Sequence, residues 1–142
     1  MTLTIVETRD IALCLQLRRV VFIEEQGVSE ADERDTLDGV AIHLLAELNG
    51  RAVGSARLLV MKDIGKIGRV CVLREGRGAG IGAALIRAAV ERFRSEAGVI
   101  KVKLGAQVHA QAFYERLGFA AIGDVYQDAG IAHRDMLLVF GT

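Results

Sequence analysis

A glycine-rich segment carries the clearest sign of chemistry in this sequence. Residues 70–82, VCVLREGRGAGIG, place glycine at every second position from 76 to 82, between an apolar run and an alanine-rich stretch. Glycine weakens a strand or a helix by roughly 0.5–1 kcal/mol relative to alanine, so four glycines at this junction indicate that the backbone itself is needed. Inward-turned N–H groups bind anions, and a helix that begins there adds the positive end of its dipole. With Arg74, Arg77 and Arg87 nearby, the segment predicts a pyrophosphate site.

Other glycine-rich loops fit the segment less well. The phosphate loop of nucleoside triphosphatases is excluded because no Gly-Lys-Ser/Thr triplet occurs in the chain. The dinucleotide fingerprint G-x-G-x-x-G/A is matched by Gly78, Gly80 and Ala83, but it needs an acidic residue at the end of the next strand, which here ends in KLG. The pattern R-x-x-G-x-G is filled by residues 77–82. A tight turn packed against its helix is the structural alternative, and it would explain one or two of the glycines.

The composition is that of an ordinary globular chain. The 142 residues, of which 51% are hydrophobic and 25% charged, are expected to form a single domain over residues 1–142. Lysine plus arginine and aspartate plus glutamate balance at 18 each, so no overall field favours nucleic acid or a membrane surface. The sequence MTLTIVETRD lacks the apolar core of a signal peptide, and no apolar run approaches the about 18 residues of a membrane span. Cys14 and Cys71 form no metal or disulfide pattern, so we expect buried, reduced thiols and a cytoplasmic location.

Hydrophobic periodicity predicts a mixed α/β fold around the glycine-rich segment. Strands are expected over residues 2–6, 40–48, 52–61, 66–73, 99–104 and 131–140. Helices are expected near residues 13–21, 80–94 and 107–117, with a polar loop or frayed helix over 27–39. Asn49-Gly50-Arg51 is a hairpin turn signal, which makes the middle strands an antiparallel meander. The segment itself lies inside a βαβ crossover, so the strands on either side of helix 80–94 should run parallel.

Several segments of the chain resemble the GNAT superfamily of N-acetyltransferases. Residues 70–82 resemble its acetyl-CoA-binding strand, pyrophosphate loop and helix start, and FYERLGF at 113–119 resembles its later motif, in which a tyrosine on a short helix precedes Gly-Phe. LRRVVFIEEQGV (17–28) and AGIAHRDM (129–136) resemble a subfamily of small, single-domain members. The resemblance covers nearly the whole chain. It implies an α/β (α+β) fold with a GNAT-like mixed sheet, in which an antiparallel N-terminal meander is joined to a crossover with splayed parallel strands.

The resemblance implies a binding site for acetyl-CoA, the acyl donor. In the family, free backbone groups of the splayed strand bond the pantetheine arm, and here these groups belong to Val70, Cys71 and Val72, facing Leu104 and Gly105. The thiol of Cys71 is expected only to pack. Backbone N–H groups for the pyrophosphate would come from Arg77, Gly78, Ala79, Gly80, Ile81 and Gly82. The cofactor-binding set is completed by Phe113 and by Gln107, which stands where many members have an asparagine that contacts the pantetheine.

Tyr114 is the catalytic residue that the resemblance implies. In the family, a tyrosine here protonates the departing CoA thiolate or hydrogen-bonds its sulfur, and a phenol with a pKa of about 10 is protonated at neutral pH. The alternative is a core aromatic, because Tyr114 shares a helical stripe with Ala110, Phe113 and Leu117. The implied mechanism is direct attack of an amine on the thioester, with the N–H of Val72 or a neighbour polarising the carbonyl. The candidate bases are Glu24, Glu25, His43, His133 and the acids of residues 30–35.

The acceptor is left open by the sequence. The resemblance places its site in residues 22–40 and 122–135, and Asp32, Glu33, Asp35 and Asp38 make the first segment acidic, which favours a cationic amine or polyamine. The expected partners are a small-molecule or peptide amine and, as in many family members, a second copy of the chain in a homodimer, without nucleic acid or membrane. Three widely separated histidines indicate no metal site. The alternative function is a CoA-binding sensor or assembly module that does not turn over.

Overall fold

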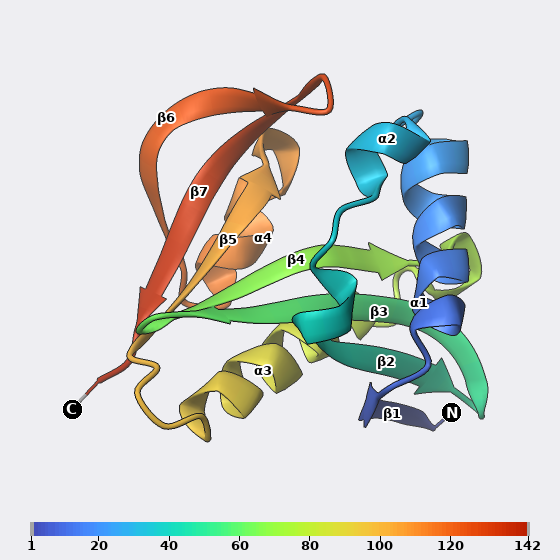
Figure 1. The fold of residues 1–142 in the computed structure, drawn as a ribbon, viewed down its shortest axis with the longest axis horizontal. Helices are drawn as coiled ribbons and strands as arrows, with labels where there is room; N and C mark the ends of the chain where they lie inside the picture. The colour runs from blue at the N-terminus through green and yellow to red at the C-terminus, as the bar shows by residue number, and fades with distance from the viewer. Residues whose placement is uncertain (1, 142) are drawn as a thin grey trace.

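The strands form one mixed sheet, whose two halves diverge in the middle. The structure, a computed structural model, describes residues 2–141. The seven-stranded sheet has the order β1-β2-β3-β4-β5-β7-β6; β4 and β5 run parallel, and every other neighbouring pair is antiparallel. Figure 1 shows β5, β7 and β6 rising away from the plane of β1 to β4. The strands are β1 Leu3–Thr8, β2 Ile42–Leu48, β3 Arg51–Met61, β4 Ile64–Val72, β5 Lys101–Gln107, β6 Ala120–Asp128 and β7 Ile131–Val139.

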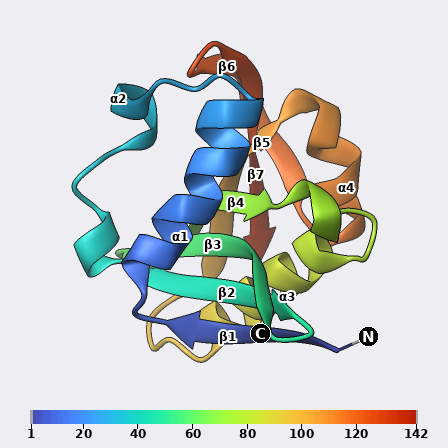
Figure 2. The same ribbon diagram turned by 90° about the vertical axis from the view of Figure 1, so that its right-hand side faces the viewer.

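Helices lie on both faces of the sheet. The α-helices are α1 Ile11–Arg18, α2 Glu30–Glu33, α3 Ile81–Arg94 and α4 Gln111–Arg116, and α1 continues as a π-helix over Arg19–Glu25. Figure 2 shows α1 crossing one face of β2, β3 and β4, while α3 lies on the opposite face. No helix within residues 2–141 is both long enough and apolar enough to cross a lipid bilayer.

The larger part of the hydrophobic core lies between α3 and the sheet. Leu85 and Phe93 of α3 are fully buried there, together with Leu58 of β3 and Val102 of β5. A Cβ atom at Gly65 would lie 2.5 Å from the Phe93 ring, so this close approach of strand and helix requires glycine. A smaller cluster on the other face packs α1 and the turns after it on the sheet, through residues Leu17, Val21, Leu45 and Cys71. Strand β4 is therefore held from both faces along its C-terminal half.

The parallel strands separate halfway along β4. Their pairing runs from Ile64↔Lys101 to Ile67↔Leu104 and then ends, although both strands continue. Just past this point β4 carries a β-bulge, because three residue steps on β4 (Gly68 to Cys71) face two on β3 (Arg57 to Ser55). Arg69 sits in the bulge with a positive φ of 52°. Bulges bend a strand and increase its twist, so this one directs β4 away from β5 and confirms the expected splay.

Most of the expected elements are present, but the expected order lacked one strand. Strand β6 was missed because nearly all of its residues are exposed, which leaves no apolar alternation to detect. The helix expected near residues 107–117 is shorter than predicted, since β5 extends to Gln107 and a 3₁₀ turn precedes α4. The hairpin at Asn49-Gly50 is confirmed, with positive φ angles of 53° and 83°. Both cysteines are buried free thiols, as expected.

Candidate active site

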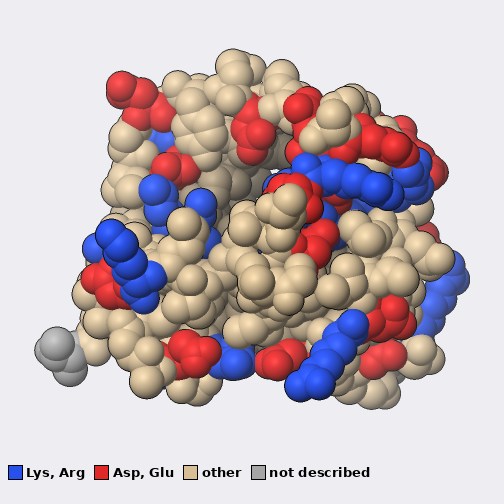
Figure 3. Space-filling model, in the orientation of Figure 1, with Lys and Arg blue, Asp and Glu red and all other residues tan. Residues whose placement is uncertain are grey.

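The divergence of β4 from β5 opens two adjoining pockets. The larger one, of about 860 Å³, lies between α2, β3, β4 and the β6–β7 hairpin; the smaller one, of about 550 Å³, lies beside the end of β4 and the glycine-rich segment. Figure 3 shows a hollow in this face with acidic and basic side chains around it. Four residues line both pockets, namely Gln26, Val70, Gln107 and Ile131. These shared residues join the two pockets at the splay.

Alternate backbone groups of β4 point into the gap. The Leu73 N–H donates to the carbonyl of Val53 on β3, at 2.7 Å. Because backbone groups alternate in direction along an antiparallel strand, those of Cys71 also point toward β3, and those of Val70 and Val72 point toward β5. The expectation that Cys71 contributes backbone groups to the gap is therefore wrong. Its buried thiol lies 3.4 Å from Ser55 Oγ, and burial raises the pKa of that thiol, which is consistent with a packing role.

The glycine-rich segment presents free N–H groups at the start of α3. Gly78 and Gly80 have positive φ angles of 84° and 75°, and Gly80 precedes the first residue of the helix, Ile81, without any side-chain cap. The N–H groups of residues 78–82 thus form no hydrogen bond within the described part of the chain. Arg77 differs from the sequence expectation, because its own N–H donates to the carbonyl of Arg74 at 3.2 Å in a 3₁₀ turn. The run of free N–H groups therefore begins at Gly78.

The side chain of Arg77 bonds to two neighbouring segments. Its Nη2 lies 2.6 Å from Oε2 of Glu25, and its Nε donates to the carbonyl of Val72 at 3.1 Å. The guanidinium thus connects the turns after α1 to the end of β4. Glu25, one of the candidate bases, is occupied by this ion pair and by a longer one to Arg74, at 4.0 Å.

Tyr114 lines the larger pocket from α4. Its ring packs edge-to-face on Phe113 and Phe119, with centroids 5.0 Å and 6.3 Å away. Its hydroxyl forms no hydrogen bond within residues 2–141, and burial raises the pKa of the phenol above its ordinary value. Phe113 lines neither pocket; it packs toward the glycine-rich segment, where a Cβ at Gly82 would lie 3.7 Å from its ring. The pocket face of α4 therefore belongs to Tyr114, and Phe113 acts as its support.

Gln107 lies across the junction of the two pockets. Its Nε2 donates to Oε1 of Gln26 at 3.1 Å, and its Oε1 lies 2.7 Å from Nε2 of His109. A side-chain amide can exchange such bonds for equivalent ones to a ligand amide. The position is consistent with the pantetheine contact that the sequence predicts for Gln107.

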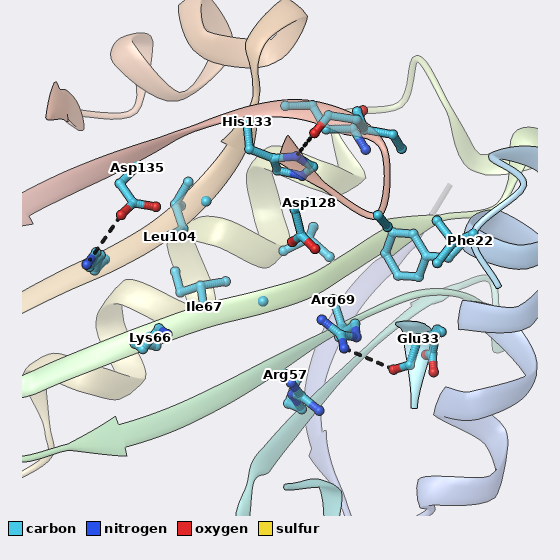
Figure 4. A pocket seen from close by; sticks show the side chains of 18 of the residues that line it. Phe22, Glu33, Arg57, Lys66, Ile67, Arg69, Leu104, Asp128, His133 and Asp135 are labelled. Carbon is cyan, nitrogen blue, oxygen red and sulfur yellow. Dashed lines mark hydrogen bonds and ion pairs between the residues drawn. The ribbon is translucent and has the colours of Figure 1, made fainter. Parts of the chain in front are cut away.

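His133 faces the larger pocket from β7. Its Nδ1 lies 2.7 Å from the carbonyl oxygen of Ile131, and its ring stacks on Tyr126 with centroids 5.9 Å apart. The Tyr126 hydroxyl donates to Oδ1 of Asp135 at 2.6 Å, and burial together with this bond raises the pKa of Tyr126. Figure 4 shows His133 pointing into the pocket, with Asp128 next to it. The imidazole is thus held on two sides.

The other candidate bases are paired or remote. His43 is buried, with its Nε2 2.9 Å from the carbonyl of Asp38. Glu24 lines neither pocket, and Glu30 is paired with Arg19 on the surface. Glu33 and Asp35 form ion pairs with arginines, and Asp32 lines the larger pocket without an ion pair inside residues 2–141. Of the candidates, His133 and Asp32 are the groups that line the larger pocket and have no ion-pair partner within residues 2–141.

Sequence reasoning missed several residues that line the larger pocket. Tyr126 and Asp135 escaped notice because β6 was not recognised and because their contact spans a hairpin. Arg57 and Arg69 interrupt largely apolar strand sequences, RAVGSARLLVM and IGKIGRVCV, and this interruption is a signal that could have found them. Over the described chain, no cluster of three or more His, Cys, Asp or Glu side chains could hold a metal ion.

Comparison with known proteins identifies the family. The family model described as acetyltransferase (GNAT) domain matches residues 18–140. A Bacillus subtilis (strain 168) protein assigned as an acetyltransferase is 36% identical over 132 residues, which are 91% of this chain and 89% of that protein. A crystal structure of a Lactobacillus plantarum protein assigned as an N-acetyltransferase has a TM-score of 0.88 at 26% identity, covering 98% of this chain and 99% of that one. A Pseudomonas aeruginosa acyl-CoA N-acyltransferase has a TM-score of 0.84 at 33% identity, covering 97% and 99%. The chain belongs to the GNAT family of acetyltransferases and is an acyltransferase enzyme.

Proposed function

We propose that the protein transfers an acetyl group from acetyl-CoA directly to a primary amine in a ternary complex. The observation that carries this proposal is the separation of β4 from β5 beyond Ile67 and Leu104, with a pocket on each side and Val70 lining both. A donor in the smaller pocket and an amine in the larger one would meet at Val70. Holding both reactants in one geometry is the main requirement of direct transfer.

The smaller pocket would bind the donor largely through backbone groups. The free N–H groups of residues 78–82 and the N-terminal end of α3 suit a pyrophosphate. The gap-facing groups of Val70 and Val72 suit the amides of the pantetheine arm, which would add to β4 as an extra strand. The Gln107 amide would contact the same arm. The P. aeruginosa relative, an acyl-CoA N-acyltransferase by name, supports an acyl-CoA donor.

The Val70 N–H is the donor best suited to polarise the thioester carbonyl. Val70 lines both pockets, and Tyr114 lines the larger one, whereas Val72 lines only the smaller pocket and its carbonyl accepts from Arg77. The sequence predicted that the N–H of Val72 or of a neighbouring residue polarises the carbonyl. The pocket geometry favours the N–H of Val70 over that of Val72 for this role. A preorganised N–H aimed at the developing oxyanion contributes about 3 kcal/mol to a transition state.

His133 is the base that would take the proton from the amine. A carbonyl oxygen can only accept, so the bond to Ile131 places a hydrogen on Nδ1, and the neutral ring then carries its lone pair on Nε2. The stacked Tyr126, anchored on Asp135, fixes the plane of the imidazole. The amine that has lost its proton to Nε2 is the nucleophile that attacks the thioester carbonyl.

Tyr114 would complete the reaction as the acid. As the new C–N bond forms and the C–S bond breaks, the electron pair of the broken bond goes to sulfur, and the phenol gives that sulfur its proton. The nitrogen of the new amide then loses its second proton through water to the phenolate, which restores Tyr114, and His133 releases the first proton to solvent. The raised pKa of Tyr114 keeps it protonated for this step.

The proposal is tested by incubating the purified protein with acetyl-CoA and a panel of primary amines. Free thiol is followed by a disulfide reagent, and acetylated product is followed by mass spectrometry, with amine-free and enzyme-free reactions as controls. Stoichiometric formation of thiol and N-acetylated amine is the expected result. Binding of acetyl-CoA without transfer to any amine would contradict the proposal and support a sensor or assembly role.

A further inference from the structure

The acidic segment after the π-helix is neutralised by arginines. Arg18 pairs with Glu33 at 2.5 Å and with Asp38 at 2.8 Å. The side chains of Arg18 and Glu33 are almost fully buried. Arg57 of β3 pairs with Asp35 at 2.8 Å and with Asp38 at 3.1 Å. Three carboxylates thus face three guanidiniums, counting Arg69, which lies 3.4 Å from Asp35. Of the four acids on which the expected cationic or polyamine acceptor rested, only Asp32 is left without an ion pair within residues 2–141.

Hydrogen-bond donors on these arginines are left over at the pocket wall. The Nε atoms of Arg57 and Arg69 are buried and have no partner within residues 2–141, and both side chains line the larger pocket. The Arg57 side chain is only 6% exposed. Nη2 of Arg69 donates to the carbonyl of Glu33 and to Asp35. Its Nη1 has no partner within residues 2–141 and is not among the buried atoms, so it is accessible to solvent.

Two lysines, Lys66 and Lys103, line the same pocket as Arg57 and Arg69. Burial lowers the pKa of the Arg69 guanidinium, and the charges of Arg57 and Arg18 lower it further, so an added anion would stabilise its charged form. Lys66 lies opposite Lys103 where β4 and β5 are still paired, and both line the pocket. Lys103 is 3.4 Å from Asp135, whereas Lys66 has no ion pair inside the described range. Figure 4 shows Lys66, Arg57 and Arg69 along β3 and β4, with His133 and Asp128 on the facing wall.

Resting on the proposed N-acetyl transfer, we infer that the acceptor amine also carries a carboxylate, which the Arg69 guanidinium binds with Lys66 adding positive charge. Arg69 and Val70 are neighbours on β4 and line the same pocket, so a carboxylate on the guanidinium and an amine at Val70 would share that pocket. The facing wall offers Asp128 for the ammonium form of the amine and His133 for its deprotonation. A planar guanidinium fork matches a carboxylate. The acceptor class is thus an amino acid or another small aminocarboxylate.

The inference is tested with matched acceptors that differ only in the carboxylate, namely leucine, leucinamide and isoamylamine, and with 4-aminobutanoate as a longer aminocarboxylate. Arg69→Gln should raise the KM for the preferred aminocarboxylate about tenfold to a hundredfold, the range for losing one hydrogen bond to a charged group. The KM for leucinamide and for acetyl-CoA should change less than about twofold. Arg69→Lys should recover part of the affinity, because it keeps the charge and loses the fork.

Lys66→Gln guards against a folding defect in the Arg69 variants, because Lys66 has no ion pair to lose within residues 2–141. It should raise the same KM about threefold to tenfold, whereas Lys62→Gln, which removes one charge outside both pockets, should not.

Carboxylate binding is measured separately from transfer by following the Arg69 Nε–H signal in ¹⁵N NMR spectra during titration with leucine and with isoamylamine. A shift with leucine alone supports the carboxylate site even if no amine is acetylated, which would contradict only the proposed transfer. No shift with leucine or 4-aminobutanoate, or equal use of leucinamide, overturns the inference.

Discussion

The carbonyl oxygen of Ile131 lies 2.7 Å from Nδ1 of His133, which places the ring hydrogen on Nδ1 and leaves the lone pair of the neutral ring on Nε2. A backbone carbonyl is a permanent acceptor, so the tautomer does not depend on any ligand. The same hairpin supplies Tyr126 and Asp135, which brace the ring from the other side. The β6–β7 hairpin therefore supplies the proposed base and its supports from residues close in sequence.

His133→Ala should lower kcat by about 10²-fold to 10⁴-fold at neutral pH, which is the usual contribution of a general base. The loss should shrink as the pH approaches about 10, where the amine deprotonates without help. Steady-state kinetics against pH measure this, and calorimetry with acetyl-CoA serves as the control for an intact donor site. A loss of equal size at every pH would assign His133 a structural role instead.

Tyr114→Phe should lower kcat about 10²-fold and leave the KM for acetyl-CoA unchanged, because it removes only the proton that sulfur needs. Stability should change by less than about 0.5 kcal/mol, since the hydroxyl has no hydrogen bond to lose within residues 2–141. Because burial raises the pKa of Tyr114, the wild-type rate should show no decline from its ionisation below about pH 10. Unchanged kcat in the variant would make Tyr114 a core aromatic.

Asp35 should make folding stability sensitive to acid. The hydrogen bond from Arg57 lowers the pKa of Asp35 from 3.8 to about 2. A carboxyl whose pKa is lower in the folded state stabilises the fold at a pH above its unfolded pKa and loses that contribution as the pH falls toward its folded pKa. For Asp35 this contribution to the free energy of unfolding is about 2 kcal/mol. Urea unfolding of wild type and Asp35→Asn at pH 7, 5, 4 and 3 should show a gap that narrows between pH 5 and pH 3. A gap independent of pH would contradict the assignment.

Gly105 and Tyr126 should be coupled. A Cβ atom at Gly105 would lie 2.5 Å from the Tyr126 hydroxyl, and its next nearest atoms would be 3.7 Å and 3.8 Å away. Gly105→Ala should therefore destabilise the wild type by about 1–3 kcal/mol. In a Tyr126→Phe background, where the hydroxyl is gone, the same change should cost less than about 0.5 kcal/mol, as a double-mutant cycle of unfolding free energies would measure. Equal costs in both backgrounds would refute the contact.

The features that the sequence predicted correctly are those with a local physical cause. Gly78 and Gly80 adopt left-handed conformations that glycine favours, and Asn49-Gly50 forms the tight turn that this pair favours. The β4–α3–β5 crossover follows from two apolar runs around an amphipathic helix. In each case a few adjacent residues determine the structure, so a single sequence is enough.

The features that the sequence did not predict depend on contacts between distant segments. Arg69 occupies the bulge with a positive φ although arginine has no preference for that conformation, so tertiary packing decides the position of the bulge. Glu33 and Asp35 read as a solvated acidic loop, but they are paired with Arg18 and Arg57 from separate elements. The free N–H groups were also placed one residue early, because the 3₁₀ turn that engages Arg77 has no clear sequence signal.

The central claim is that the backbone of the glycine-rich segment binds the pyrophosphate of an acyl-CoA donor. Calorimetric titration with acetyl-CoA, CoA and ATP tests it most directly, on wild type, Gly80→Val and Gly98→Val. Gly80 and Gly98 both have positive φ and open space where a Cβ atom would lie, so valine imposes similar backbone strain at each, but Gly98 lies outside both pockets. We predict roughly micromolar binding of both CoA species and no binding of ATP, with CoA binding lost in Gly80→Val and kept in Gly98→Val. Well-folded wild type that does not bind CoA, or equal binding by the two variants, would contradict the account.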